Sequence, residues 1–210
     1  MNALINTSSP DPSSNPLLSF GRGIAQYDQV KPEQIAPAIE FLLSGCEAAV
    51  TKAIDPKTPA SWNDLAEPLE DATEQLGRSW GVVSHLNAVA DTPELRAAYG
   101  AMLPKVTAFF ASLGQNLALY ERYKEIKASA EFLTLSPEQQ KVIDNSLRDF
   151  RLGGAELPDS QKPRFAAIQD EQATLAKAFS DHVLDATDSF VHLVTNQVDL
   201  TGLPDDVIAA

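Results

Sequence analysis

The sequence predicts an all-α fold: an antiparallel bundle or array of about six to seven helices, with at most one short strand near the C-terminus. Apolar residues recur at spacings of three and four over most of the 210 residues, which is the period of an amphipathic helix. Serine or threonine directly followed by proline occurs before some of these segments and is a typical helix start. A single stretch, residues 189–195, is instead rich in β-branched and aromatic residues.

Composition narrows the class of protein. The chain has 44% hydrophobic residues, and no apolar run approaches the roughly 18 residues of a membrane span. Its net charge of −13 argues against nucleic acid and anionic membranes as partners. The single cysteine, Cys46, excludes an internal disulfide and is typical of a reducing compartment. Without a basic, apolar secretory signal at the N-terminus, we expect a cytoplasmic protein.

The first part of the chain divides into a leader and a domain. Residues 1–20 are polar and rich in proline, so we expect them to be a mobile leader, with residues 21–210 as one helical domain. Gly21-Arg22-Gly23 resembles half of a phosphate-binding loop. Because no strand precedes it and no full glycine pattern follows, we do not expect it to bind phosphate.

The first long helix is predicted over Pro37–Ile54, after a separate short turn that opens at Pro32. A proline inside a helix costs about 3 kcal/mol, so one continuous helix from Pro32 is disfavoured. Cys46 lies on the apolar stripe of this helix, and a packed thiol is favoured over a nucleophile. The stripe consists of Ile39, Leu42, Leu43, Cys46 and Val50.

A second long helix is predicted after Ser61, which is a suitable N-cap with Asp64 three residues later. Pro68 is expected to kink its first turns. At about 100° per residue its apolar positions fall within roughly 60° of one another. They are Leu65, Leu69, Ala72, Leu76, Val83 and Ala90, with Asp71, Glu74 and Arg78 on the other side.

Two polar residues of this helix allow sharper expectations. His85 lies opposite the apolar stripe and should face solvent or a partner. Asn87 lies on the apolar side, where a buried amide costs free energy unless it is paired. We therefore expect the Asn87 side chain to form a hydrogen bond with a neighbouring helix.

The remaining elements follow similar signals. Asp91-Thr92-Pro93-Glu94 stops one helix and starts the next, which should break near Gly114 and continue to about Ala128. Ser136-Pro137-Glu138-Gln139 starts a helix that reaches Phe150 and ends at Gly153-Gly154.

Leu157-Pro158-Asp159-Ser160 is expected to start a helix of about 28 residues, followed by the strand-like residues 189–195. The apolar stripe of that helix is Phe165, Ile168, Leu175, Phe179, Val183 and Ala186. Leu203-Pro204-Asp205-Asp206 looks like one more helix start. Because the chain stops about one turn later, we expect Ala210 to be a cut end.

No catalytic apparatus can be assembled from the residue spacing. His85, His182 and His192 form no His-Glu-x-x-His motif, and no two of them lie one helical turn apart. We expect His182 at the edge of the core. The hypothesis of a Ser/His/Asp triad stays open, because the members of a triad need not be close in sequence. No nucleophile-elbow pattern occurs, however.

Asp181, Asp185 and Asp188 form a carboxylate row on one helix face, with Lys177 one turn before it. A solvated face with a Lys177–Asp181 pair is favoured over a cation site. The sequence therefore assigns no catalytic, cofactor-binding or metal-binding residue.

Several short motifs occur in a specific order. They are Trp62-Asn63-Asp64-Leu65 with Pro68-Leu69, Leu76-Gly77-Arg78, Ser84-His85-Leu86-Asn87-Ala88-Val89, Pro93-Glu94-Leu95-Arg96, Asn145-Ser146-Leu147-Arg148-Asp149-Phe150 and His182-Val183-Leu184-Asp185-Ala186-Thr187. In this order they resemble the N-terminal part of the bacterial oligopeptidase A group within the thimet oligopeptidase family of zinc metallopeptidases. The resemblance covers about residues 24–210.

The resemblance implies a mostly helical, non-catalytic region that forms part of the wall of a substrate channel. In the family this channel admits short, unfolded peptides, and zinc-activated water hydrolyses them in a separate catalytic half. No cofactor is expected in this chain itself; zinc would belong to the full-length family enzyme. The implied partners are the C-terminal catalytic half and, in the full-length protein, short peptide substrates.

Two readings stay open. The chain is either the non-catalytic part of such an enzyme or a free-standing helical module that binds peptides or proteins without enzymatic activity. The unfinished helix after Pro204 favours the first reading. On that reading, apolar residues near the C-terminal end would lack their usual cover, and self-association is possible. They are Phe190, Val191, Leu193 and Val194.

Overall fold

The computed structural model describes residues 14–90 and 92–209. The α-helices of this part of the chain are α1 (Pro16–Ser19), α2 (Pro32–Ile54), α3 (Glu67–Val89), α4 (Pro93–Gly114), α5 (Leu117–Ala128), α6 (Pro137–Leu152), α7 (Lys162–Ser189) and α8 (Asp205–Ala209). Short helical turns lie between them: η1 (Tyr27–Gln29), η2 (Trp62–Ala66), η3 (Glu131–Thr134) and η4 (Gln197–Leu200). The described residues contain no strand, so the all-α prediction is confirmed.

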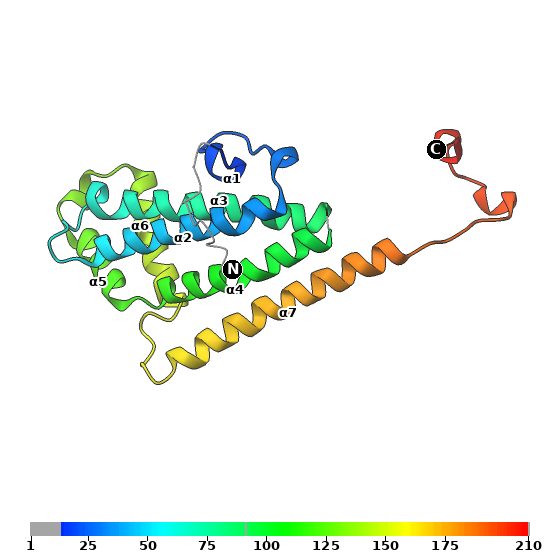
Figure 1. Cartoon of the computed structure of the whole chain (residues 1–210). Helices are drawn as coiled ribbons and strands as arrows, with labels where there is room; N and C mark the ends of the chain where they lie inside the picture. Colours follow the sequence, from blue (N-terminus) through cyan, green and yellow to red (C-terminus); the bar gives the residue numbers. More distant parts are fainter. Residues whose placement is uncertain (1–13, 91, 210) are drawn as a thin grey trace, which may run out of the picture. The chain divides into compact units, whose positions relative to one another are not determined.

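The first hydrophobic core lies between α2, α3 and α4, which run alongside one another (Figure 1). Ile39, Leu76 and Val83 are completely buried there, and Leu17 of α1 covers one side of the same cluster. The apolar stripes predicted for α2 and α3 therefore do meet in the interior.

A second core joins the C-terminal end of α2 and the start of α3 to the α5–α6 pair. Tyr123 and Phe150 pack at its centre with their ring centroids 5.4 Å apart. Val50 and Leu113 pack against both cores. The two cores therefore belong to one continuous interior.

The ends of α4 and α6 approach each other very closely at two glycines. A Cβ atom on Gly153 would lie 2.8 Å from the Cα atom of Gly114 and 2.9 Å from its carbonyl oxygen. Any larger residue at Gly153 would have to push the two helix ends apart. The pair that the sequence analysis expected to end helices thus also sets the spacing of α4 and α6.

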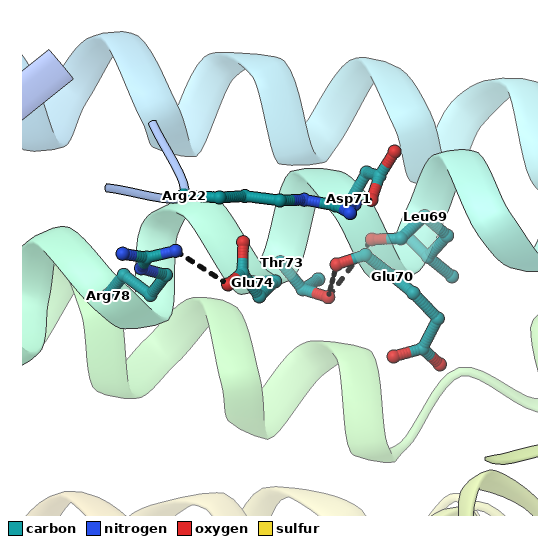
Figure 2. Close-up of polar contacts among 7 residues, drawn as sticks. All are labelled: Arg22, Leu69, Glu70, Asp71, Thr73, Glu74 and Arg78. Carbon is teal, nitrogen blue, oxygen red and sulfur yellow. Dashed lines mark hydrogen bonds and ion pairs between the residues drawn. The ribbon is translucent and has the colours of Figure 1, made fainter. Parts of the chain in front are cut away.

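The segment before α2 is attached to α3 by basic side chains (Figure 2). Arg22 forms an ion pair with Asp71 at 2.7 Å, and Arg78 donates a hydrogen bond to the carbonyl oxygen of Gly23 at 2.6 Å. The guanidinium of Arg78 also lies over the ring of Phe20, 5.1 Å from its centroid. Polar residues expected on the outer face of α3 therefore serve to hold the preceding segment.

Residues 14–20 differ from the mobile leader that we expected over residues 1–20. Leu17 is 1% exposed, and its carbonyl oxygen accepts a hydrogen bond of 2.6 Å from the buried Ser79 hydroxyl. Asn15 caps α1 and also donates to the carbonyl oxygen of Gln34 at 3.0 Å. A polar, proline-rich stretch can thus still dock through one leucine and one cap. Residues 1–13 lie outside the described residues.

The predicted boundary of α2 is wrong. The helix begins at Pro32, with Pro37 inside it. At the start of the helix, Gln34 Oε1 accepts a hydrogen bond from the backbone N–H of Lys31 at 2.8 Å. The residues after Pro37, Ala38 and Ile39, are fully buried. Burial of this face outweighs the cost of one interior proline close to the helix start.

The start signals predicted at Ser61, Thr92 and Ser136 are confirmed, and Asn116 is a further N-cap that the sequence analysis did not predict. Thr92, Asn116 and Ser136 each accept a hydrogen bond from a backbone N–H of the following helix, and Ser136 and Gln139 form a full capping box. Ser61 caps the π-turn η2, which leads directly into α3, and Pro68 is the second residue of α3. Asp91 of the stop-and-restart signal lies outside the described residues.

The C-terminal part departs most from expectation. The chain divides into two compact units, Met1–Leu175 and Ala176–Ala210, with the boundary inside α7. Residues 157–161 form a turn, so α7 starts later than predicted, at Lys162. All of α7 lies within the described residues, and none of its residues is buried. Leu175 and Phe179 are 61% and 71% exposed.

Residues 190–196 are extended but belong to no sheet, and the strand expected at Phe190–Thr195 is not formed. A strand needs a hydrogen-bonding partner, and none is present in the described part of the chain. Phe190, Val191, Leu193 and Val194 are all exposed. The helix start predicted at Leu203–Asp206 is confirmed by α8.

Candidate functional site

The three histidines do not form a site in the described residues. His85 is exposed on α3, and its ring meets that of Tyr27 edge-on with centroids 5.3 Å apart. His182 on α7 is exposed, further out than the core edge that we expected, and His192 is exposed as well.

No group of three or more His, Cys, Asp or Glu side chains within residues 14–90 and 92–209 is placed to hold a metal ion. The side chains in these two ranges therefore do not fit the zinc that the sequence resemblance implies for the full-length enzyme. No helix in this part of the chain is both long and apolar enough to cross a membrane.

The carboxylate row of α7 has the ion pair that was predicted for it. Lys177 Nζ lies 2.5 Å from Asp181 Oδ2, one helical turn apart. The pair is partly buried, with the two side chains 21% and 17% exposed, so Asp181 is less solvated than we expected.

Cys46 is a packed structural thiol, as predicted. Its side chain is fully buried, and Sγ donates to the carbonyl oxygen of Ala72 at 3.2 Å. Burial, with a smaller contribution from Glu47, raises the pKa of the thiol to about 11. Since the thiolate is the reactive form, this cysteine is a poor nucleophile at neutral pH.

Within the described residues, the Asn87 oxygen does not form the hydrogen bond between helices that we expected of this side chain. Its side chain is 9% exposed on α3, but Oδ1 has no hydrogen-bond partner among the residues that the structure describes. The helical period correctly placed the amide on the buried side. It could not show which group lies opposite the oxygen.

An open groove with a volume of about 620 Å³ lies between α2 and α4. Its floor is apolar and consists of Leu43, Val50, Phe109 and Leu113. Ala108, an exposed residue of α4, also lines the groove. Leu43 and Phe109 are also buried members of the first core, so the floor of the groove is part of that core.

The rim of this groove carries hydrogen-bonding groups of both kinds. The hydroxyls of Thr51 and Ser112 donate to carbonyl oxygens of their own helices, so their oxygen atoms are left to accept. Glu47 adds a carboxylate and Lys105 an ammonium group, which pairs with Glu40. An apolar floor with acceptors and one cation along the edge suits an extended polypeptide better than a compact polar molecule.

Sequence reasoning did not find this groove. Glu47, Lys105 and Ser112 belong to two helices and are ordinary exposed residues in the pattern of each one. The only signal in the sequence was that the α2 and α4 segments both have apolar stripes and could pack together. Neither stripe gives the rotation at which two helices meet.

The sequence is similar to the N-terminal part of known oligopeptidases. The family model described as Neurolysin/Thimet oligopeptidase, N-terminal domain, matches residues 39–162. Oligopeptidase A of Haemophilus influenzae is 39% identical over 198 residues, which are 94% of this chain and 29% of that protein. Oligopeptidase A of Salmonella typhimurium is 37% identical over 198 residues, with the same coverage.

A plant relative, the probable cytosolic oligopeptidase A of Arabidopsis thaliana, is 37% identical over 195 residues, covering 91% of this chain and 27% of that protein. The chain thus spans less than a third of the length of these relatives.

Proposed function

The chain belongs to the neurolysin/thimet oligopeptidase family as an N-terminal domain of the oligopeptidase A kind, and from this we propose that it forms a non-catalytic part of a peptide-binding channel wall. The observation that carries the proposal is the groove between α2 and α4. Its apolar floor can take side chains of an extended peptide, and its rim hydroxyls can accept from backbone N–H groups. A folded protein cannot present its backbone in this way.

Peptide hydrolysis itself would belong to a separate catalytic region that holds zinc. In such a protein, this domain contributes binding and access, and none of its residues is assigned to the chemistry. The exposed apolar residues of α7 and of residues 190–194 would pack on that region, because large exposed apolar side chains are typical of an interface.

The first test is an activity measurement on the purified 210-residue chain. Fluorogenic short peptides should not be cleaved, with or without added zinc, because a zinc hydrolase needs about three protein ligands and one open position. Cleavage that depends on metal and is abolished by a chelator, in a homogeneous preparation, would contradict the non-catalytic role.

The second test concerns the groove. Unstructured peptides of about ten residues should shift the amide resonances of α2 and α4 in an NMR titration, whereas a stably folded protein of similar charge should not. Ala108→Phe fills the groove and should abolish the shifts. Ala101→Phe, at an exposed alanine of α4 outside the groove lining, is the matched control and should leave them unchanged.

A second candidate function is a free-standing peptide- or protein-interaction module without enzymatic activity. The exposed side of α7, with Leu175 at 61% and Phe179 at 71%, also suits this reading. Mass measurement of the native protein in its own cells separates the two. A native product that ends at Ala210 would favour the module.

A further inference from the structure

A second cavity, of about 330 Å³, lies where α3, α4, α5 and α6 meet. Its lining combines apolar and aromatic side chains, among them Phe110, Leu113 and Phe150, with the carboxylates of Glu70 and Asp149. Phe110 is 40% exposed, so the cavity can be reached from solvent. The Glu70 side chain enters this lining from α3, on the side away from Arg22 and Arg78 (Figure 2).

The Glu70 carboxylate has few hydrogen bonds for its position. Oε1 lies 3.3 Å from the hydroxyl of Tyr123 and 3.2 Å from that of Ser146. The Ser146 hydroxyl is also 3.0 Å from the carbonyl oxygen of Val142, and its one proton can be donated to only one of the two. Charge-assisted hydrogen bonds from a hydroxyl to a carboxylate are normally shorter, at about 2.5–2.7 Å.

The charges around Glu70 do not compensate for this. No lysine or arginine is among the described residues that line the cavity. Burial raises the pKa of the Glu70 carboxyl, and the nearby Asp149 adds to the effect, against the lowering by Ser146 and Tyr123. The ionised carboxylate therefore lacks a counter-ion in a partly desolvated, aromatic setting.

From this arrangement, we propose that the cavity between α3, α4, α5 and α6 binds the guanidinium or ammonium group of a basic side chain, with Glu70 as its counter-ion. The apolar walls would cover the alkyl stem, and the rings of Phe110 and Tyr123 would lie beside the cation, where aromatic faces are attractive. Bidentate pairing with a carboxylate favours arginine over lysine.

This inference does not depend on the proposed role in a peptide channel. The basic group can come from a free peptide or from another segment of a longer protein, and both sources use the same chemistry. The two are separated in the last arm of the test.

The test is an NMR titration of the 210-residue chain with Nα-acetyl-arginine methylamide. Its neutral isostere, Nα-acetyl-citrulline methylamide, is the paired probe. The arginine compound should shift the amide resonances around Ser146 and Gly153 in a saturable way, with a dissociation constant of about 1 mM. The citrulline compound should cause at least about tenfold weaker shifts, and salt should weaken the binding of the arginine compound.

Glu70→Gln should abolish these shifts, and a circular dichroism spectrum would check that the variant is folded. Glu67→Gln changes an exposed glutamate of the same helix and should leave binding intact. Equal shifts with both compounds, unchanged binding in Glu70→Gln, or no saturable shift with the arginine compound would each overturn the proposal.

Repeating the titration on a longer protein that includes the catalytic region identifies the source of the cation. Retained binding means that the cavity is open to free peptides. If binding is lost in the longer protein, basic residues of the added region are substituted one at a time. A substitution that restores binding identifies the residue that occupies the cavity. Loss that no such substitution restores would contradict the proposal for the longer protein.

Discussion

Glu70 is the residue whose protonation should affect the stability of the domain most clearly. Its pKa is raised on folding, so the folded state binds the proton more tightly than the unfolded state. The resulting stabilisation is fully present below the pKa of an unfolded glutamate, about 4.3, and is lost as the pH rises through the folded pKa.

We therefore expect Glu70→Gln to be more stable than the wild type at pH 7, by about 1.4 kcal/mol for each unit by which the pKa is raised. The difference should disappear below about pH 4, where both side chains are neutral. Urea unfolding at a series of pH values measures this, with Glu67→Gln as the exposed control. A variant that is less stable at pH 7 would show that the ionised carboxylate is satisfied in the fold.

Asn87 supports a second prediction at the scale of single residues. Because its Oδ1 is buried without a described partner, replacement by an apolar group of similar shape should relieve the desolvation cost of that oxygen. We expect Asn87→Leu to be as stable as the wild type or more stable by about 1 kcal/mol, in thermal or urea unfolding.

Ser79→Ala is the contrasting variant. The Ser79 hydroxyl donates to Leu17 in a buried hydrogen bond of 2.6 Å, and its loss should cost about 1–3 kcal/mol. A large loss of stability in Asn87→Leu, equal to that of Ser79→Ala, would mean that the amide has a partner after all.

At the scale of elements, α2 contains an interior proline, Pro37, whose cost is offset by the burial of neighbouring residues. Pro37 is exposed, so its replacement loses no packing, while alanine restores a backbone N–H that can bond within the helix. We expect Pro37→Ala to raise the free energy of unfolding by about 1–2 kcal/mol, since the gain is reduced by the more flexible unfolded chain.

Pro32→Ala is the matched control for α2. Pro32 occupies the first helical position, where its missing N–H is not needed and its fixed φ favours the helix. This variant should be neutral or slightly less stable in the same unfolding experiment. Equal gains in both variants would mean that the helix position of Pro37 has no special cost.

At the scale of the whole molecule, the two units should differ in hydrogen exchange. Residues 190–196 belong to no helix or sheet, and their apolar side chains are exposed, whereas α3 lies in both cores. In a dilute sample we expect amides of residues 190–196 to exchange almost as fast as an unfolded peptide, and those of Leu65–Val89 to be the most protected.

Equal protection in the two segments would mean that the C-terminal part docks within its own domain, and it would favour the free-standing module. Protection of residues 190–196 that rises with protein concentration would mean that a second copy covers them. Self-association stays a prediction until that measurement.

The sequence by itself determined the helical class and most helix starts, because these depend on residues within one turn of each other. Ser136 and Gln139, or Thr92 and Pro93, cap a helix wherever that helix packs. The period of apolar residues likewise placed Cys46 and Asn87 on buried faces and His85 on an exposed one.

Only the tertiary structure decided what those faces meet. Glu70, Tyr123 and Ser146 come from three different helices, and the α2–α4 groove depends on how two stripes rotate against each other. The tertiary structure also decided that α2 continues through Pro37, because burial of the neighbouring residues outweighs the cost of the proline. It likewise left residues 190–196 without a strand to pair with. Such outcomes depend on contacts between residues far apart in the chain, and a local pattern carries no information about which distant residue will lie opposite.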